Sequence, residues 1–188
     1  MSSTVNCQLS TVSLPHCIAF IGSGGKTTAI EQLAKKLLGQ GKTVKITTTT
    51  KMYWPTDPDL RDIYAGAPSG EEGKMRGLPD EQRRALLETC DYVLVEADGA
   101  HGRPLKFPRE FEPVIPPEAD LVVLVAGLRG IGQTAAETVH CPELARAYLG
   151  VPPEHRITAA DVAALFRVYM EKAAAQAPGA RLLMLFCP

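Results

Sequence analysis

The chain has 188 residues, of which 45% are hydrophobic and 22% are charged, and its formal net charge is -1. This length suffices for one folded core, so we expect a single domain over residues 1–188. A near-zero charge supplies no basic field, so we expect neither nucleic acid nor a membrane as a partner.

Residues 1–13 are polar and lack the basic and apolar regions of a secretion signal. The cysteines Cys7, Cys17, Cys90, Cys141 and Cys187 are scattered without a C-x-x-C pair, which is typical of reduced thiols. We therefore expect a cytoplasmic protein.

A glycine-rich segment separates an apolar run from an amphipathic one. Residues 16–21 predict a buried strand, and apolar residues recur at helical spacing over residues 30–38. Such a loop binds phosphate through its N–H groups and the helix dipole, whereas a flexible linker lacks these flanks. The candidate nucleotide-binding residues are Gly22, Ser23, Gly24, Gly25, Lys26, Thr27 and Thr28.

Two side chains of this loop have expected chemical roles. We expect Lys26 to contact the β- and γ-phosphates as a catalytic group, and the Thr27 hydroxyl to bind Mg²⁺. Phe20 stands where the general pattern G-x-x-x-x-G-K-[ST] has glycine, and the shorter loop looks like that of the Mur ligases. ATP or GTP with Mg²⁺ is therefore the expected cofactor set.

A threonine run follows the next predicted strand, residues 43–47, and ends at Lys51. The propensity of β-branched residues for strands is one explanation of the run. At the carboxyl end of a parallel strand, however, hydroxyls and a cation line the ligand crevice. We therefore add Thr48, Thr49 and Lys51 to the candidate nucleotide-binding residues.

Residues 53–79 are rich in proline, glycine and aspartate and predict a loop region with a hairpin around residues 61–65. Residues 80–89 predict a helix, and residues 92–96 predict a third buried strand.

Two carboxylates, Glu96 and Asp98, follow the third strand. A buried carboxylate must be paired, hydrated or bound to metal, and in P-loop proteins an acid here holds Mg²⁺. If the extended backbone continues, both point to one side and converge on one ion or water. We expect Glu96 to bind Mg²⁺ and Asp98 to be a catalytic acid or water-orienting base. The alternative is a helix N-cap or an ion pair with Lys51 or Arg103.

Arg103 and Lys106 lie in a proline-stiffened loop after these carboxylates. They are candidates for holding a phosphate or an anionic substrate, with Lys106 in a catalytic role, and a solvated surface loop is the alternative. His101 has no partner at zinc-ligand spacing, so a zinc site is not expected.

The remaining chain completes the alternation of strands and helices. Residues 120–126 predict a strand, Thr158 caps a helix whose inward stripe includes Tyr169 and Met170, and residues 181–186 predict a last strand. The fold class is therefore α/β: a P-loop NTPase-like three-layer sandwich with a mostly parallel sheet.

The order of these motifs resembles the YqeC family of selenium-dependent molybdenum hydroxylase accessory proteins. The matching pieces are GSGGKTT at 22–28, TTTTKM at 47–52, EADGA at 96–100, PLK at 104–106, EPVIP at 112–116 and TVH at 138–140. The resemblance runs from about Ile18 to near Arg181. It implies a nucleotide-binding protein that serves selenium and molybdenum cofactor maturation, with a selenium- or molybdopterin-related small molecule and a molybdenum hydroxylase as partners.

Two positions depart from the family pattern. Family members continue past the last strand with an Asn-Lys-x-Asp-like segment that resembles the base-reading motif of GTPases, whereas this sequence ends at Pro188. We therefore expect a truncated or divergent member, and the choice between ATP and GTP stays open. Cys141 stands where the pattern has arginine, which weakens any anion contact there.

The leading hypothesis is an enzyme or switch that binds the nucleotide with Mg²⁺ and hydrolyses it or transfers a phosphoryl group. One alternative is a Mur-like ligase or kinase that activates a small acidic substrate, with residues 48–51, Arg103 and Lys106 as the acceptor pocket. The other is a non-catalytic, nucleotide-dependent carrier or docking module for a partner hydroxylase.

Overall fold

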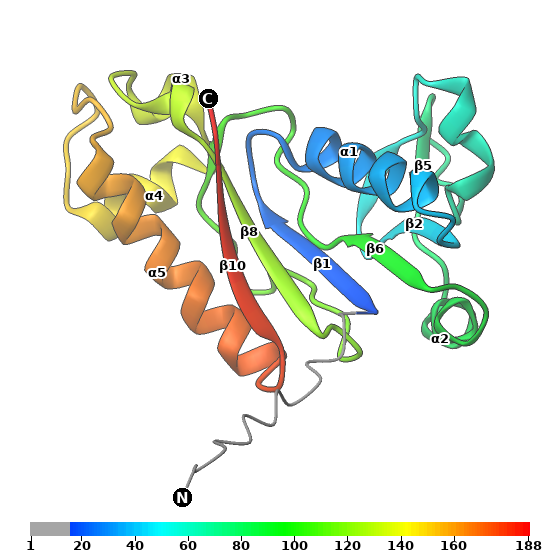
Figure 1. Cartoon of the computed structure of the whole chain (residues 1–188). Coiled ribbons are helices and arrows are strands. Elements are labelled where there is room, and N and C mark those ends of the chain that lie inside the picture. Colours follow the sequence, from blue (N-terminus) through cyan, green and yellow to red (C-terminus); the bar gives the residue numbers. More distant parts are fainter. Residues whose placement is uncertain (1–15) are drawn as a thin grey trace, which may run out of the picture.

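The computed structural model describes residues 16–188, so the N-terminal segment 1–13 and Cys7 lie outside the described residues. The central sheet has five parallel strands in the order β10-β8-β1-β6-β2 (Figure 1). They are β1 (Cys17–Gly22), β2 (Val44–Thr48), β6 (Tyr92–Glu96), β8 (Leu121–Gly127) and β10 (Arg181–Cys187). Because all five run the same way, their carboxyl ends meet at one edge of the sheet.

Helices cover both faces of this sheet. On one face, α1 (Lys26–Gly39) packs through Ile30, Ala34 and Leu37. On the other, α5 (Ala159–Gln176) packs beside α4 (Pro142–Leu149), with Phe166 and Tyr169 among its buried residues, and α2 (Asp80–Thr89) lies near β6. The predicted α/β fold is confirmed, and the layers are those of a P-loop NTPase-like sandwich.

A small antiparallel sheet lies beyond the β2 edge. It pairs β5 (Lys74–Arg76) with β3 (Lys51–Tyr53) and β4 (Ala67–Pro68). The hairpin predicted around residues 61–65 is wrong, because this stretch belongs to a 3₁₀ helix, η1 (Pro58–Ile63), and the residues after it. Asp57 caps η1 by accepting the Asp59 N–H at 3.0 Å, and the proline at its first position favours the turn.

Several short elements near the carboxyl edge of the central sheet were not predicted from the sequence. A two-residue strand, β7 (Leu105–Lys106), pairs in parallel with β9 (Val139–His140). A 3₁₀ turn, η2 (Leu128–Gly130), and a short helix, α3 (Ala135–Thr138), connect β8 to β9. Within residues 16–188, no helix combines the length and apolarity needed to cross a membrane.

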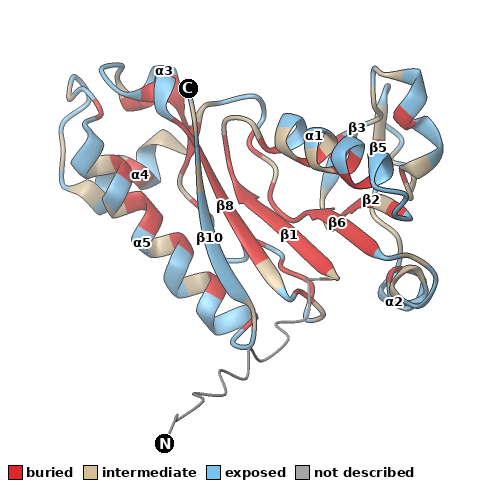
Figure 2. Cartoon of the chain, viewed as in Figure 1, coloured by how far each residue is buried: buried red, intermediate tan, exposed pale blue. Residues whose placement is uncertain are grey.

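The strands differ in burial across the sheet. The inner strands β8, β1 and β6 are buried along almost their whole length, whereas the edge strand β10 is largely exposed, with Leu183 and Met184 each 52% exposed (Figure 2). Met170 was predicted to face inward on α5 but is 39% exposed. It lies one position, about 100°, past Tyr169 around the helix, which turns it toward solvent.

Candidate functional site: the glycine loop and the carboxyl edge of the sheet

The loop of residues 22–25 turns the chain from β1 into α1 at the carboxyl edge of the sheet. Gly22 has φ +84, and a Cβ there would lie 2.3 Å from the Val125 carbonyl oxygen. Gly24 has φ +75, and a Cβ there would lie 2.4 Å from the Pro104 carbonyl oxygen. Both positions therefore require glycine, for conformation as well as for space.

The first two amides of the loop bind groups inside the protein. The Gly22 N–H donates to Asp98 Oδ2 at 3.1 Å, and the Ser23 N–H donates to the Val125 carbonyl at 2.9 Å. The Ser23 hydroxyl also donates, to the Pro104 carbonyl at 3.0 Å. Ser23 therefore fastens the loop rather than facing a ligand.

The following amides are free of protein acceptors. Across the described part of the chain, the N–H groups from Gly24 to Thr28 donate to no backbone or side-chain group, and the helix has no side-chain cap. Consecutive free N–H groups at a helix N-terminus, together with the helix dipole, form a binding site for an anion such as phosphate.

Lys26 brings a positive charge to this loop. Its side chain is buried, and its Nζ donates to the Gly22 carbonyl at 2.6 Å. Burial lowers the pKa of Lys26, while the nearby carboxylates of Glu96 and Asp98 oppose that shift. The Lys26 amino group thus lies at the base of the loop, beside two carboxylates that partly offset the lowering of its pKa.

Glu96 lies at the carboxyl end of β6, beside the first turn of α1. Its Oε2 accepts a hydrogen bond from the Thr27 hydroxyl at 3.2 Å. Burial raises the pKa of Glu96, and the charge of Lys26 and the bond from Thr27 offset part of that rise. A bound cation would favour the ionised carboxylate further.

These two oxygen groups suit Mg²⁺, which prefers hard ligands. Within residues 16–188 there is no cluster of three or more His, Cys, Asp or Glu side chains that could hold a metal by itself. Thr27 and Glu96 would therefore hold the ion together with phosphate oxygens and water, as is usual for Mg²⁺ at nucleotide sites.

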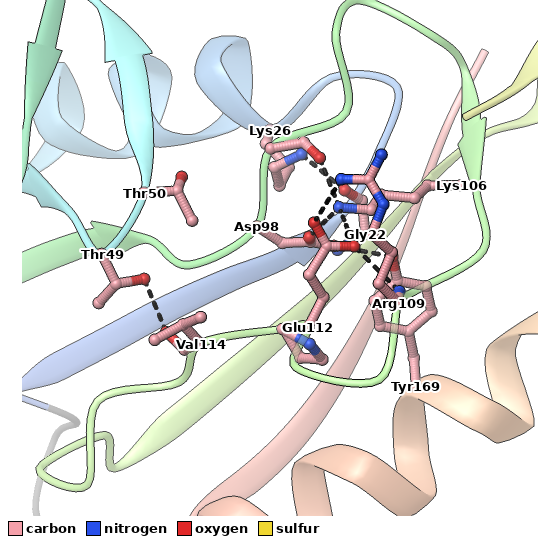
Figure 3. Close-up of polar contacts among 12 residues, drawn as sticks. Gly22, Lys26, Thr49, Thr50, Asp98, Lys106, Arg109, Glu112, Val114 and Tyr169 are labelled. Atoms are coloured by element: carbon pink, nitrogen blue, oxygen red, sulfur yellow. Dashed lines mark hydrogen bonds and ion pairs between the residues drawn. The ribbon is translucent and has the colours of Figure 1, made fainter. Parts of the chain in front are cut away.

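Asp98 and Lys106 lie inside the protein, beneath the loop (Figure 3). Lys106 Nζ donates to Asp98 and pairs with Glu112 Oε2 at 2.9 Å, and the Tyr169 hydroxyl donates to Asp98 Oδ2 at 2.7 Å. Among the described residues, the carboxylates of Glu96 and Asp98 share no hydrogen-bond partner, since that of Glu96 accepts from Thr27 and that of Asp98 from Gly22, Lys106 and Tyr169. This geometry favours a positioning role for Asp98 over the water-orienting role expected from sequence, and it keeps Lys106 from the surface.

The other candidate residues bind different parts of the molecule. The Thr48 hydroxyl donates to the Glu96 carbonyl at 2.7 Å, and the Thr49 hydroxyl donates to the Val114 carbonyl at 2.6 Å. Lys51 forms an ion pair with Glu71 at 2.6 Å, on the small sheet. The structure therefore places Thr48 beside Glu96, and turns Thr49 and Lys51 to other segments.

Arg103 donates to the carbonyl of Glu137 in α3. Over the described residues, neither Arg103 nor Lys51 pairs with Glu96 or Asp98, so the ion pairs considered as an alternative from sequence are not formed.

Sequence reasoning missed Glu112 and Tyr169, which complete the buried cluster with Asp98 and Lys106. The only signal for Tyr169 was its place in the apolar stripe of α5, which indicates a core residue. Glu112 carried a signal only as part of the EPVIP segment. Neither pattern distinguishes a packing or loop residue from one that belongs to a buried polar cluster.

Comparison with known proteins identifies the family of the chain. The model of the family described as YqeC protein matches residues 18–143, a span that contains every candidate site residue from Gly22 to Lys106. The YqeC protein of Escherichia coli (strain K12) is 34% identical over 175 residues, covering 81% of this chain and 68% of that relative. The chain therefore belongs to the YqeC family.

Proposed function

We propose that the protein binds ATP or GTP with Mg²⁺ through residues 24–28 and Glu96. The observation that carries this proposal is the run of free N–H groups from Gly24 to Thr28, flanked by the Lys26 ammonium and the Thr27–Glu96 oxygen pair. The amides and Lys26 would hold the phosphate oxygens. Bound Mg²⁺ would neutralise charge on those oxygens during hydrolysis or phosphoryl transfer.

We further propose that this nucleotide chemistry serves selenium or molybdenum cofactor maturation in the cytoplasm, on a small selenium- or molybdopterin-related molecule or on a molybdenum hydroxylase. Membership of the YqeC family supports this role through the resemblance described above. A hydrolase or switch is favoured over a Mur-like ligase, because three residues of the acceptor pocket expected from residues 48–51, Arg103 and Lys106 bind other segments, namely Thr49, Lys51 and Arg103.

Replacing Glu96 by glutamine tests the metal-dependent part of the site. The amide keeps the shape of the side chain but removes the charge that Mg²⁺ requires, so affinity for ATP or GTP with Mg²⁺ should fall about 10–100-fold. Affinity for the same nucleotide in EDTA should change much less. Isothermal titration calorimetry with and without Mg²⁺ measures both.

A matched control is Glu31→Gln, since Glu31 is a carboxylate on α1 that accepts a hydrogen bond from Tyr64 at 2.8 Å. This variant should leave both affinities at the wild-type value. If Glu96→Gln lost affinity equally with and without the metal, Glu96 would be a structural partner of Thr27 and the proposed metal site would be wrong.

A further inference from the structure

Tyr169 belongs to α5, on the face of the sheet opposite α1, yet its hydroxyl takes part in the cluster beneath the loop. The side chain is buried, and its hydroxyl donates to Asp98 Oδ2 at 2.7 Å. Burial raises the pKa of Tyr169 well above its ordinary value, and the neighbouring Asp98 raises it further. The phenol therefore stays protonated and remains a donor at any physiological pH.

The carboxylate of Asp98 is held from three directions. Oδ2 accepts both the Tyr169 hydroxyl and the Gly22 N–H, while Oδ1 accepts Lys106 (Figure 3). These donors come from α5, from the end of β1 and from β7. Because Tyr169 and Gly22 bind the same oxygen, the position of the hydroxyl determines where that oxygen meets the loop.

Lys106 is itself fixed by further contacts. It donates to the Gly99 carbonyl at 2.5 Å and pairs with Glu112. Glu112 Oε2 also accepts a hydrogen bond from the backbone N–H of Arg109 at 3.0 Å. Burial alone would raise the pKa of Glu112, but the bonds from Arg109 and Lys106 bring it below its usual value. Glu112 is thus ionised at neutral pH and stabilises the charge of Lys106.

The segment that carries Glu112 is fastened to α5 as well. Lys172 donates to the carbonyls of Arg109 and Glu110 at 2.9 and 2.7 Å, and Gln176 donates to the Pro113 carbonyl at 2.8 Å. With Tyr169, these residues recur every three or four positions and share one face of the helix. One face of α5 therefore holds both the carboxylate that binds Gly22 and the segment that carries Glu112.

We propose that Asp98, Lys106, Glu112 and Tyr169 form a buried brace, and that Tyr169 is a positioning residue of the nucleotide site. The brace holds the Gly22 amide turned inward, which leaves the N–H groups from Gly24 onward facing the phosphates. This inference rests on the proposed nucleotide site and deepens it, because it assigns a role in phosphate binding to a residue of α5.

The first test uses protein without ligand. Tyr169→Phe removes the hydroxyl and keeps the ring. Hydrogen exchange of the Gly22 amide, measured by NMR, should become about tenfold faster, because Asp98 loses one of the hydrogen bonds that fix it against the loop. Tyr64→Phe is the matched control, since Tyr64 also donates to a carboxylate, Glu31, at 2.8 Å. The control should leave exchange at Gly22 unchanged.

The second test measures affinity for ATP, GTP and tripolyphosphate by calorimetry. Tyr169→Phe should weaken all three by about three- to tenfold, through partial loss of loop order, whereas Tyr64→Phe should not. Tripolyphosphate isolates the phosphate contacts from those to the base. A general loss of stability would instead affect both variants alike.

Equal exchange at Gly22 in wild type and Tyr169→Phe would overturn the brace. Faster exchange with unchanged tripolyphosphate affinity would overturn the positioning role. If wild-type protein bound none of the three ligands, the proposed nucleotide function would fail, while the exchange measurement would still decide whether the brace orders the loop.

Discussion

Lys26→Met will lower affinity for ATP or GTP with Mg²⁺ by about a hundredfold or more, which corresponds to about 3 kcal/mol for loss of a preorganised charge contact. The Lys26 ammonium lies within the loop, 2.6 Å from the Gly22 carbonyl, where phosphate oxygens would replace that weaker partner. Methionine has a similar length and fits the same space without charge. Calorimetry on the folded variant measures the loss.

We expect the fold of Lys26→Met to survive. Burial disfavours the ammonium, so removing it also removes a desolvation cost, and the raised pKa of Glu96 lets that carboxyl become neutral. Lys36→Met, in the last turn of the same helix, is the control and should bind nucleotide as wild type does. Unchanged affinity in a folded Lys26→Met protein would refute the phosphate loop.

Lys106→Met is expected to lower the free energy of unfolding by about 3–5 kcal/mol, the usual cost of leaving a buried charge without its partner. Lys106 pairs with both Asp98 and Glu112, and all three side chains are largely buried. Removing Lys106 leaves two carboxylates close together in a poorly solvated site, and the Arg109 guanidinium, 3.9 Å from Glu112 Oε1, reaches one of them at a longer distance. Urea unfolding followed by circular dichroism measures the difference.

A second substitution separates charge balance from packing. Asp98→Asn in the Lys106→Met background removes one unpaired carboxylate and should restore at least about 1 kcal/mol, because the amide oxygen can still accept from Gly22 and Tyr169. Lys172→Met, at a partly exposed lysine that binds carbonyls on the same face, is the control and should cost less than about 1 kcal/mol. If Lys106→Met itself lowered the free energy of unfolding by less than about 1 kcal/mol, the stabilising role given to the Lys106 ion pairs would be wrong.

The elements that the sequence predicted well are those specified by local patterns. The helix predicted at residues 80–89 and the strand predicted at 92–96 match α2 and β6. Thr158 caps α5 as predicted, by accepting the Asp161 N–H at 3.2 Å. In each case a cap residue or a short apolar run is contained within the element itself.

The elements that the sequence did not predict depend on distant partners. β7 and β9 have two residues each and exist as strands only because Leu105 meets Val139 and Lys106 meets His140. The strands β3 and β5 of the small sheet have only three residues each, so their single buried positions, Met52 and Met75, are too few to establish a period. Pairing over such distances leaves no periodic signal in either segment.

The candidate site also has one part that the sequence could predict and one part that it could not. The meeting of Thr27 with Glu96 follows from two strand ends that share one edge of a parallel sheet, so the sequence could place them together. The burial of Asp98 and Lys106 could not be predicted, because Tyr169 and Glu112 enclose them from segments whose patterns indicate packing or a loop. Spacing reveals which residue types are present, but not what covers them.

The inward bonds of Gly22 and Ser23 also bear on how the protein folds. The acceptor of the Gly22 amide is Asp98, 76 residues further along the chain, and that of Ser23 is Val125, at the end of another strand. Contacts between segments so far apart in the sequence form slowly. The loop of residues 22–25 therefore acquires its final shape only after these later segments have docked. A ligand that recognises the finished loop would therefore stabilise the native state by slowing unfolding, with little effect on the rate of folding.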